Sequence, residues 1–255
     1  MSASRIEQLS PAPAVPGPLD DDALVALYDQ PDRPSWLRVN FVATADGSAT
    51  ADGVSGSLGG DADLRVFDLL RRIADVVLVA AGTVRAEGYG AMRLHDADVA
   101  WRRDHDLPDH PVFAILSGSL ALDPTSSVFT EAPVRPIVLT RSGADPARRA
   151  ALAAVADVVD CGSADDDDTV DAGVVRRVLA DRGLRRVHCE GGPSLLGMLV
   201  AADEVDELCL TTSPVLEGGA GPRIATGGSS ELRAMRLAHV LRSDDVLLTR
   251  YVRAR

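Results

Sequence analysis

The hydrophobic positions of the chain alternate between short unbroken runs and helical stripes. Residues 75–81 form a continuous apolar run, which is typical of a strand covered on both faces of a parallel sheet. Residues 61–74 carry an apolar stripe with helical spacing. Residues 185–189 form a second short central strand, and an apolar helix is expected from residue 193. This alternation predicts an α/β fold with a mostly parallel central sheet.

The same patterns predict the remaining elements. Further strands are expected over residues 36–43, 111–116, 136–140, 158–161 and 205–212. Further helices are expected over residues 23–28, 82–87, 145–155 and 169–182. Residues 235–240 and 246–252 are joined by a short connection, which predicts an antiparallel hairpin at the C-terminal edge of the sheet. Residues 88–110 have little periodicity and are expected to form a long surface loop.

Two regions of different composition are expected along the chain. Residues 1–18 are rich in proline, alanine and serine, which predicts a mobile or loosely packed leader. With the capped helix that follows, residues 1–34 are expected to form an N-terminal leader and short helix. Residues 35–255 contain no internal repeat and no linker, so they predict a single domain.

Composition narrows the classes of function. The net charge is −12, which argues against nucleic acid or an anionic membrane as the main partner. All 26 basic residues are arginine, so Schiff-base lysine chemistry and a P-loop lysine are excluded. The three cysteines are unpatterned, so no disulfide framework or zinc site follows. No apolar run is long enough for a membrane span, and no signal peptide is recognised, so a cytoplasmic protein is expected.

The candidate chemistry centres on residues 187–196, with the sequence VHCEGGPSLL. Gly191 and Gly192 allow a tight turn at the end of a strand, and Pro193 suits the first turn of a helix. The free N–H groups at that helix start favour a phosphate or pyrophosphate. The segment lacks the full G-x-G-x-x-G fingerprint, so an ordinary strand–helix turn without a ligand is the alternative.

Glycine-marked turns after three predicted strands are expected at one edge of the sheet, where they can line one cleft. Acidic groups at its floor and arginines at its rim would suit a ligand with a polar ring and a phosphate. The residues concerned are Asp46, Ser55, Thr83, Glu87, Glu190, Arg71, Arg85 and Arg93. Ordinary roles remain open for them: a turn residue for Asp46, a helix cap for Thr83 and surface side chains for the arginines.

Other mechanisms have little support in the sequence. The five histidines lack the spacing of a metal hydrolase or zinc deaminase, and no metal site is predicted. His188 lies inside a core strand and is expected to be buried. Ser55 and Ser57 lack the strand and helix of a nucleophile elbow. The aspartate run at residues 165–168 is expected to be the solvated cap of the next helix.

Taken together, the segments resemble the reductase domain of bacterial riboflavin biosynthesis, the RibD C-terminal type, which has a three-layer dihydrofolate-reductase-like fold. The resemblance spans roughly residues 36–253. It rests on NFVATADG at residues 40–47, VVLVAAGTVRAE at 76–87, EGGPSL at 190–195 and PVLEGG at 214–219. Each motif alone is weak, but their shared order and spacing are specific.

The resemblance implies an NADPH-dependent oxidoreductase acting on a phosphorylated pyrimidine. Hydride would pass from nicotinamide C4 to the ribose C1′ of 5-amino-6-(5-phosphoribosylamino)uracil and give the ribitylamino product. Most of the rate would come from positioning the two carbons, and a nearby carboxylate would stabilise a cationic imine or pass a proton. Family members commonly form homodimers, so a homodimer is expected, with the C-terminal hairpin contributing to it.

The resemblance also assigns roles to individual residues. Asp46 is the expected acidic group near the reacting centre, and Arg141 is the candidate for the NADPH 2′-phosphate. Substrate contacts are implied for Ser55, Arg71, Arg93 and Glu190, with the two arginines on the sugar phosphate. Cofactor contacts are implied for Val42, Ala43, Thr83, Glu87, Ser117, Thr140, Arg141, Gly191, Gly192, Pro193, Ser194, Leu195 and Leu196.

Two departures from the bifunctional enzymes of this pathway affect the prediction. The zinc-deaminase motifs are missing and the leader is short, so a stand-alone reductase is expected. Asn40 stands where those enzymes usually have lysine, which puts the identity of the substrate in doubt. Reduction of dihydrofolate or another pterin-like ring is the alternative on the same fold. A non-catalytic NADP-binding dimer is the alternative of a different class.

Overall fold

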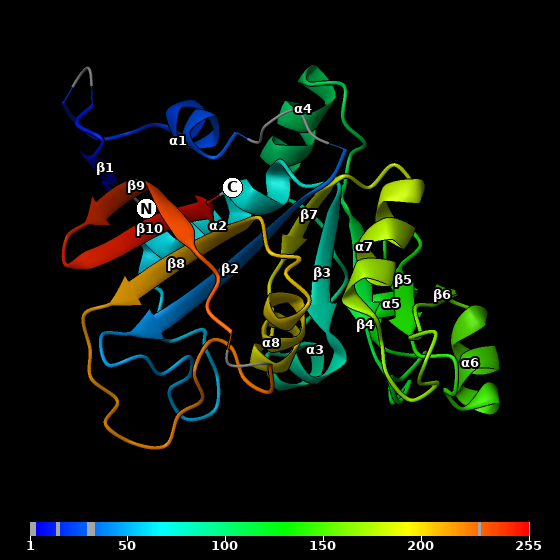
Figure 1. Ribbon diagram of the computed structural model, residues 1–255. Helices are drawn as coiled ribbons and strands as arrows, with labels where there is room; N and C mark the ends of the chain where they lie inside the picture. The colour runs from blue at the N-terminus through cyan, green and yellow to red at the C-terminus, as the bar shows by residue number, and fades with distance from the viewer. Residues whose placement is uncertain (1–3, 14–15, 30–33, 229–230, 255) are drawn as a thin grey trace. The chain divides into compact units, whose positions relative to one another are not determined.

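The computed structural model describes residues 4–13, 16–29, 34–228 and 231–254. The chain divides into two compact parts. The first part consists of Met1–Leu70 and Pro193–Arg255, and the second part is Arg71–Gly192. Each contains five of the described strands (Figure 1). The single domain expected over residues 35–255 stays a prediction.

The strands of the first part follow the order β1-β9-β10-β8-β2. They are β1 (Glu7–Ser10), β2 (Trp36–Thr44), β8 (Glu207–Ser213), β9 (Met235–Ser243) and β10 (Val246–Arg253). Strands β2 and β8 are parallel, whereas β8, β10, β9 and β1 pair antiparallel. Strands β9 and β10 lie side by side, as Figure 1 shows. The predicted C-terminal hairpin and antiparallel edge are therefore confirmed.

Strand β1 lies within the segment that the sequence predicts to be loosely packed. Glu7 pairs with Arg242 of β9, and Ile6 is fully buried. The prediction of a loosely packed leader is therefore wrong for residues 6–10, because one apolar side chain and a few ladder hydrogen bonds suffice to attach them. Residues 1–3 and 14–15 of that leader lie outside the described residues.

Three helices begin in the first part: α1 (Asp21–Leu27), α2 (Gly60–Arg72) and α8 (Pro193–Ala201). The Asp20 carboxylate caps α1 by accepting a hydrogen bond from the Ala23 N–H at 2.8 Å. At the other end of α1, the guanidinium groups of Arg38 and Arg250 donate to the carbonyls of Tyr28 and Leu27. Cationic groups at a helix C-terminus satisfy its last carbonyls and its dipole.

A buried ionic network links the strands of the first part. Glu207 and Arg38 have no exposed side-chain surface, and Arg38 Nε lies 2.5 Å from Glu207 Oε1. Arg250 Nη2 and Trp36 Nε1 donate to Glu207 Oε2 at 2.9 and 2.7 Å. Burial opposes ionisation of Glu207, but the two arginines hold its pKa at about 2. The network is therefore ionised at neutral pH.

The strands of the second part are all parallel, in the order β7-β3-β4-β5-β6. They are β3 (Val76–Ala80), β4 (Val112–Leu116), β5 (Ile137–Thr140), β6 (Asp157–Asp160) and β7 (Arg186–Cys189). The first four residues of β3 are fully buried, as its unbroken apolar sequence predicts. The α/β class and the mostly parallel sheet are therefore confirmed.

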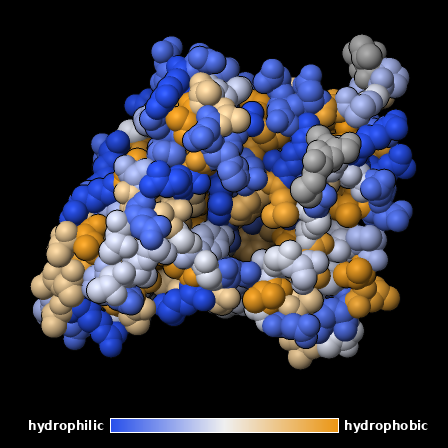
Figure 2. Space-filling view, turned by 180° about the vertical axis from the view of Figure 1, so that it is seen from behind, coloured by the Kyte–Doolittle hydropathy of each residue, from blue (hydrophilic) through white to orange (hydrophobic). Residues whose placement is uncertain are grey.

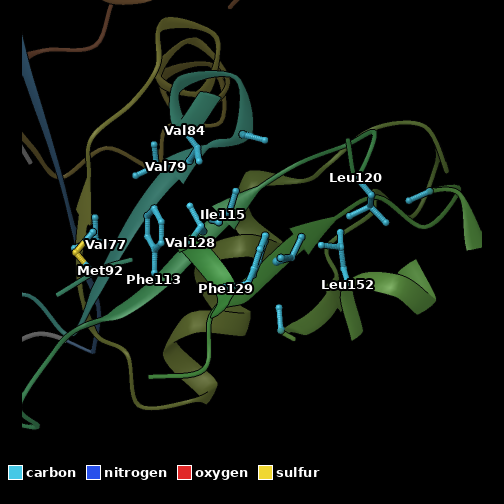
Figure 3. Close-up of a cluster of buried hydrophobic side chains, with 14 residues drawn as sticks. Val77, Val79, Val84, Met92, Phe113, Ile115, Leu120, Val128, Phe129 and Leu152 are labelled. Carbon is cyan, nitrogen blue, oxygen red and sulfur yellow. The ribbon is translucent and has the colours of Figure 1, made fainter. Parts of the chain in front are cut away.

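The second part also contains five described helices. In chain order they are α3 (Ala81–Ala86), α4 (Asp96–Asp104), α5 (Ser127–Thr130), α6 (Pro146–Ala153) and α7 (Ala172–Asp181). The apolar core of the second part joins side chains of β3 and β4 to those of the helices (Figure 3). It includes Val77, Val79, Val84, Phe113, Ile115, Val128, Phe129 and Leu152.

Helix α4 replaces part of the surface loop expected over residues 88–110. Arg102 of α4 is fully buried and donates to the carbonyls of Arg72 and Ala74 at 2.6 and 2.7 Å. Asp98 accepts a hydrogen bond from Arg72 at 2.6 Å. The helix is held by these polar contacts rather than by an apolar stripe, so its sequence lacks the periodicity on which the prediction depended.

The aspartate run at residues 165–168 does not cap α7. The cap is Asp171, whose carboxylate accepts a hydrogen bond from the Val174 N–H at 2.8 Å. The run forms an exposed turn instead, and the Asp167 carbonyl accepts from the Gly143 N–H at 2.8 Å. The expected start of the helix at Thr169 is therefore wrong by three residues.

The surface is mixed in character. The face seen in Figure 2 is mostly hydrophilic, with small groups of apolar side chains between the polar ones. Among the described residues, no helix has the length and apolar character needed to span a membrane.

Candidate functional site

The carboxylate of Glu190 is the centre of a polar cluster in the second part. Glu190 follows β7 directly, and its side chain is only 1% exposed. Arg71 donates to both carboxylate oxygens, from Nε at 2.6 Å and from Nη2 at 2.8 Å. The Tyr89 hydroxyl donates at 2.8 Å, and His188 Nε2 lies 3.5 Å from Glu190 Oε1. The structure thus brings together Arg71 and Glu190, and it confirms that His188 is buried.

The electrostatics of this cluster fix its protonation. Burial would raise the pKa of Glu190, but the charge and hydrogen bonds of Arg71, with the His188 contact, lower it from 4.5 to about 2. Burial and the charge of Glu190 raise the pKa of Tyr89. At neutral pH the cluster therefore holds an ionised carboxylate beside a protonated phenol. Sequence reasoning missed Tyr89, since it lies in a segment without periodicity or a recognised motif.

The glycine turn after Glu190 packs against the start of α3. Gly191 has a φ of +88°, which favours glycine, and its carbonyl accepts from the Ala80 N–H at 2.7 Å. A Cβ atom on Gly192 would lie 2.5 Å from Thr83 Oγ1. No larger residue fits at Gly192 without moving Thr83, so the turn keeps a bare backbone beside the Thr83 hydroxyl.

Helix α8 begins at the next residue, Pro193, as the sequence predicts. Ser194 is exposed, whereas Leu195 and Leu196 are buried. The first N–H groups of a helix have no partner within it, and they carry the positive end of its dipole. The first turn of α8 therefore has the donors that a phosphate group requires.

Asp46 lies in the first part, in the turn that follows β2. Its carboxylate accepts hydrogen bonds from the Thr44 hydroxyl at 2.5 Å and from the backbone N–H groups of Glu217 and Gly218 at 3.1 and 2.8 Å. These contacts, the Thr44 hydrogen bond above all, lower the pKa of Asp46 from 3.8 to about 2. Asp46 is therefore an ionised acceptor at neutral pH and has no proton to donate.

The contacts of Asp46 join two loops of the first part. The Ala45 N–H donates to the Val215 carbonyl at 2.9 Å. A Cβ atom on Gly221 would lie 1.8 Å from Ser48 Oγ, so the loop over residues 214–222 packs directly on the turn after β2. Asp46 thus holds the PVLEGG segment in place, which is a positioning role that sequence reasoning did not assign to it.

The other predicted residues of the first part lie on and after β2. Val42 and Ala43 pair in register with Thr211 and Thr212 of the parallel neighbour β8. Ser55 is half-buried in the loop before α2, where its carbonyl accepts a hydrogen bond from Leu58 at 3.0 Å. The cofactor roles of Val42 and Ala43 and the substrate role of Ser55 stay predictions.

The residues expected on the adenosine side gather at the ends of β4 and β5. The Thr140 hydroxyl donates to the Ser117 carbonyl at 2.7 Å, and both residues are buried. Arg141 Nε donates to the Gly118 carbonyl at 2.9 Å, while its Nη1 forms an ion pair with Asp168. The candidate reader of a 2′-phosphate is therefore paired with an exposed carboxylate of the aspartate run.

Two further predicted residues lie at the edges of the second part. Glu87 ends α3, and its N–H donates to the Thr83 carbonyl at 2.9 Å. Arg93 is exposed and donates to the Glu131 carbonyl at 3.1 Å. Among the described residues, no group of three or more histidine, cysteine or acidic side chains is arranged to hold a metal ion.

The chain is similar to proteins of known sequence over most of its length. The profile of the RibD C-terminal domain matches residues 35–249. A protein of Archaeoglobus fulgidus named 2,5-diamino-6-ribosylamino-4(3H)-pyrimidinone 5′-phosphate reductase is 24% identical over 208 residues, which cover 81% of this chain and 93% of the relative. A protein of the same name from Methanothermobacter thermautotrophicus is 30% identical over 195 residues, covering 76% and 84%.

A solved structure of similar length has the same fold. The pyrimidine reductase-like protein of Corynebacterium diphtheriae matches with a TM-score of 0.81 at 26% identity, over 91% of this chain and 98% of that protein. The profile match includes the glycine turn after Glu190 and the PVLEGG segment. The chain belongs to the RibD C-terminal domain family.

Proposed function

We propose that the protein is an NADPH-dependent reductase of a phosphorylated ribosylamino-pyrimidine in riboflavin biosynthesis. The substrate is 5-amino-6-(5-phosphoribosylamino)uracil or its 2,5-diamino-pyrimidinone counterpart, and the product is the ribitylamino compound. The family membership supports the reaction class, and two curated relatives are named for reduction of the diamino-pyrimidinone phosphate.

The observation that carries the proposal is the Arg71–Glu190 pair beside the glycine turn. A buried carboxylate that Arg71 holds ionised and to which Tyr89 donates a hydrogen bond is a fixed acceptor for the N–H groups of a pyrimidine. Arg71 and Arg93 supply positive charge for the sugar phosphate, and Arg71 shares its charge between that phosphate and Glu190. Ser55 adds a hydroxyl to the substrate.

The residues present fit a dinucleotide. Gly192 cannot carry a side chain beside Thr83, and the first turn of α8, with Ser194 exposed, offers N–H donors. Gly191, Gly192, Pro193, Ser194, Leu195 and Leu196 would therefore hold the pyrophosphate. Reduced nicotinamide supplies a hydride when it is bound. Thr83, Glu87, Val42 and Ala43 are assigned to the nicotinamide half, and Ser117, Thr140 and Arg141 to the adenosine half.

The chain's own contribution is mainly positioning. Holding the acceptor carbon about 3–3.5 Å from the donor carbon accounts for much of the rate in such reactions. Asp46 contributes a fixed negative charge near the reacting centre and anchors the loop over residues 214–222. We also propose that the protein is a cytoplasmic homodimer. Its partner is a small-molecule substrate rather than nucleic acid, since a net charge of −12 disfavours binding to nucleic acid.

The test is oxidation of NADPH by the purified chain with each pyrimidine phosphate, with dihydrofolate, and with NADH as the alternative cofactor. Turnover of a pyrimidine phosphate is expected, and Arg71→Ala should lower kcat/KM by roughly 100-fold because the substrate loses a charged partner and Glu190 loses its counter-ion. Arg103→Ala is the matched control, since Arg103 is 64% exposed and pairs with Asp109 on the surface.

The other outcomes identify the alternatives. Turnover of dihydrofolate alone would assign the chain to pterin reduction. Binding of NADPH with no reduction of any of the compounds would make it a non-catalytic NADP-binding protein. In both cases the substrate roles of Arg71, Arg93 and Glu190 would be wrong.

A further inference from the structure

The position of Tyr89, which sequence reasoning missed, is set by the way helix α3 ends. Gly88 follows the α3 cap at Glu87 and has a φ of +69°, and the Tyr89 N–H donates to the Val84 carbonyl at 3.0 Å. A left-handed glycine followed by a hydrogen bond back to the carbonyl five positions earlier is the Schellman ending of a helix. The local sequence therefore fixes the point at which the Tyr89 side chain leaves the backbone.

The ring of Tyr89 is anchored in the apolar core of the second part. It stacks on the ring of Phe113 of β4, with the ring centroids 6.0 Å apart and an interplanar angle of 15°. Tyr89 is half-buried and packs against the core drawn in Figure 3, which includes Val84 and Phe113. Close packing around an aromatic ring leaves it few orientations. The core therefore holds the hydroxyl group at the far end of the ring in one place.

The same side chain contacts both members of the Arg71–Glu190 pair. The Tyr89 hydroxyl donates to Glu190 Oε2 at 2.8 Å. The central guanidinium carbon of Arg71 lies 5.7 Å from the centroid of the Tyr89 ring, which is within the range of a cation–π contact. Tyr89 therefore restrains the carboxylate through a hydrogen bond and the guanidinium through its ring.

The contacts of Glu190 differ between its two carboxylate oxygens. Oε1 accepts from Arg71 Nε at 2.6 Å and lies 3.5 Å from His188 Nε2. Oε2 accepts from Arg71 Nη2 and from the Tyr89 hydroxyl, both at 2.8 Å. The two bonds from Arg71 fix the guanidinium and the carboxylate relative to each other. The bond from Tyr89 adds an anchor to the apolar core, so it fixes the pair relative to the fold.

Tyr89 also connects the two halves of the proposed site. Helix α3 carries Thr83 and precedes Glu87, and the proposed function assigns both residues to the cofactor. Glu190 follows β7 and is assigned to the substrate. Hydride transfer depends on the separation between the cofactor and the substrate. A side chain that leaves the end of α3 and bonds to Glu190 is therefore suited to keep that separation constant.

We propose that Tyr89 is a positioning residue for the phosphorylated pyrimidine, an inference that rests on the proposed function. Its hydroxyl orients Glu190 for the N–H groups of the pyrimidine, and its ring holds Arg71 for the sugar phosphate. Tyr89 takes no part in the transfer of hydride or proton. A misplaced acceptor and cation weaken binding of the ground state and the transition state alike, so the effect falls on KM rather than kcat.

Tyr89→Phe tests this role, because phenylalanine keeps the ring and its contacts and removes only the hydroxyl group. It should raise KM for the pyrimidine phosphate by about tenfold, as expected for a lost hydrogen bond to a charged group, and leave kcat within about twofold. The Kd of NADPH, measured by fluorescence titration, should stay unchanged. Tyr251→Phe is the matched control, since Tyr251 of β10 is half-buried and its hydroxyl forms no hydrogen bond with the described residues.

A second readout does not depend on activity. In protein labelled with ¹⁵N at arginine, the Arg71 Nε–H resonance is identified by its loss in Arg71→Ala. Its exchange with water is then measured without substrate or cofactor. Arg71 Nε donates to a buried carboxylate, so exchange should be slow in the wild-type chain and about tenfold faster in Tyr89→Phe. Tyr251→Phe should leave it unchanged.

Three results would overturn the inference. The first is a folded Tyr89→Phe protein whose KM stays within about twofold of the wild-type value. The second is a fall in kcat without a change in KM. The third is a raised KM with unchanged exchange at Arg71, since Tyr89 would then not act through the pair. Failure of the wild-type chain to reduce either pyrimidine phosphate overturns the proposed function, and the Arg71 exchange then decides separately whether Tyr89 holds the pair.

Discussion

At the scale of single residues, the structure separates the carboxylates that the sequence could only group together. Glu190 is buried and paired with Arg71, whereas Asp46 is exposed and accepts hydrogen bonds from Thr44 and from the loop at residues 217–218. Both have a pKa of about 2, but for different reasons: an arginine charge for Glu190 and hydrogen-bond donors for Asp46. Both are therefore ionised at neutral pH, and neither donates a proton.

Replacement of Asp46 tests its positioning role. Asp46→Asn should accelerate hydrogen exchange of the Glu217 and Gly218 amides by roughly tenfold, because a neutral amide oxygen is a weaker acceptor than a carboxylate. The measurement is amide exchange by NMR at neutral pH. In the wild-type chain the folded pKa is depressed, so the contact is present above pH 3.8 and is lost as the pH falls towards 2. Unchanged exchange in the variant would mean that the loop is held by its backbone alone.

At the scale of elements, the turn that contains the aspartate run at residues 165–168 works against the expected recognition of the NADPH 2′-phosphate by Arg141. Asp168 pairs with Arg141, the candidate for the 2′-phosphate, and the Asp167 carbonyl binds the Gly143 N–H. A bound 2′-phosphate would have to compete with the Asp168 carboxylate for the same guanidinium. We therefore expect the loop to weaken discrimination in favour of NADPH.

Removal of that carboxylate should strengthen binding of the phosphorylated cofactor. Asp168→Asn is expected to lower the Kd of NADPH by about threefold to tenfold and to leave NADH unchanged, because only NADPH carries the competing charge. Arg141→Ala should have the opposite effect on NADPH. Isothermal titration with both cofactors checks this, and Asp165→Asn in the same exposed run is the control. Equal changes for NADPH and NADH would show that Arg141 does not meet the 2′-phosphate.

The elements also show where sequence reasoning succeeds and fails. Strong apolar periodicity predicted β3, α8 and the β9–β10 hairpin, because the burial of those side chains is visible in their spacing. Helix α4 and strand β1 were missed because α4 is held by Arg102 and Asp98, and β1 by one apolar residue and its pairing. Contacts between residues distant in sequence leave no periodic trace.

The same limit applies to the candidate site. Motif and spacing predicted the glycine turn, Glu190 and Arg71, and the structure joins the last two. The hydrogen bond from Tyr89 to Glu190 joins residues more than a hundred positions apart in the chain. Pairing of strands, rather than local composition, brings such residues together.

At the scale of the whole molecule, stability depends on a buried charge in addition to apolar packing. Glu207 holds Arg38, Arg250 and Trp36 around the C-terminal end of α1. Its folded pKa of about 2 lies below the ordinary value of 4.5, so its contribution is fully present above pH 4.5 and is lost as the pH falls through 2. The network therefore stabilises the fold across the neutral range.

Glu207→Gln should lower the free energy of unfolding by about 3–5 kcal/mol, since it leaves buried guanidinium charges without a partner. Denaturant unfolding at neutral pH measures this change. Glu231→Gln, which breaks an exposed pair with Arg233, is the control and should cost less than about 1 kcal/mol. If Glu207→Gln lowers the free energy of unfolding no more than the control does, repacking compensates for the lost buried ion pairs.

Transfer of the hydride to C1′ of the ribosylamino group distinguishes the proposed reaction from reduction of a ring. The measurement that tests it most directly uses NADPH with deuterium at the transferred C4 position and either ribosylamino-pyrimidine phosphate, with the product examined by mass spectrometry and NMR. We expect one deuterium in the product, bound to C1′ of the ribityl chain. A product without deuterium, or with deuterium on a ring carbon, would contradict it.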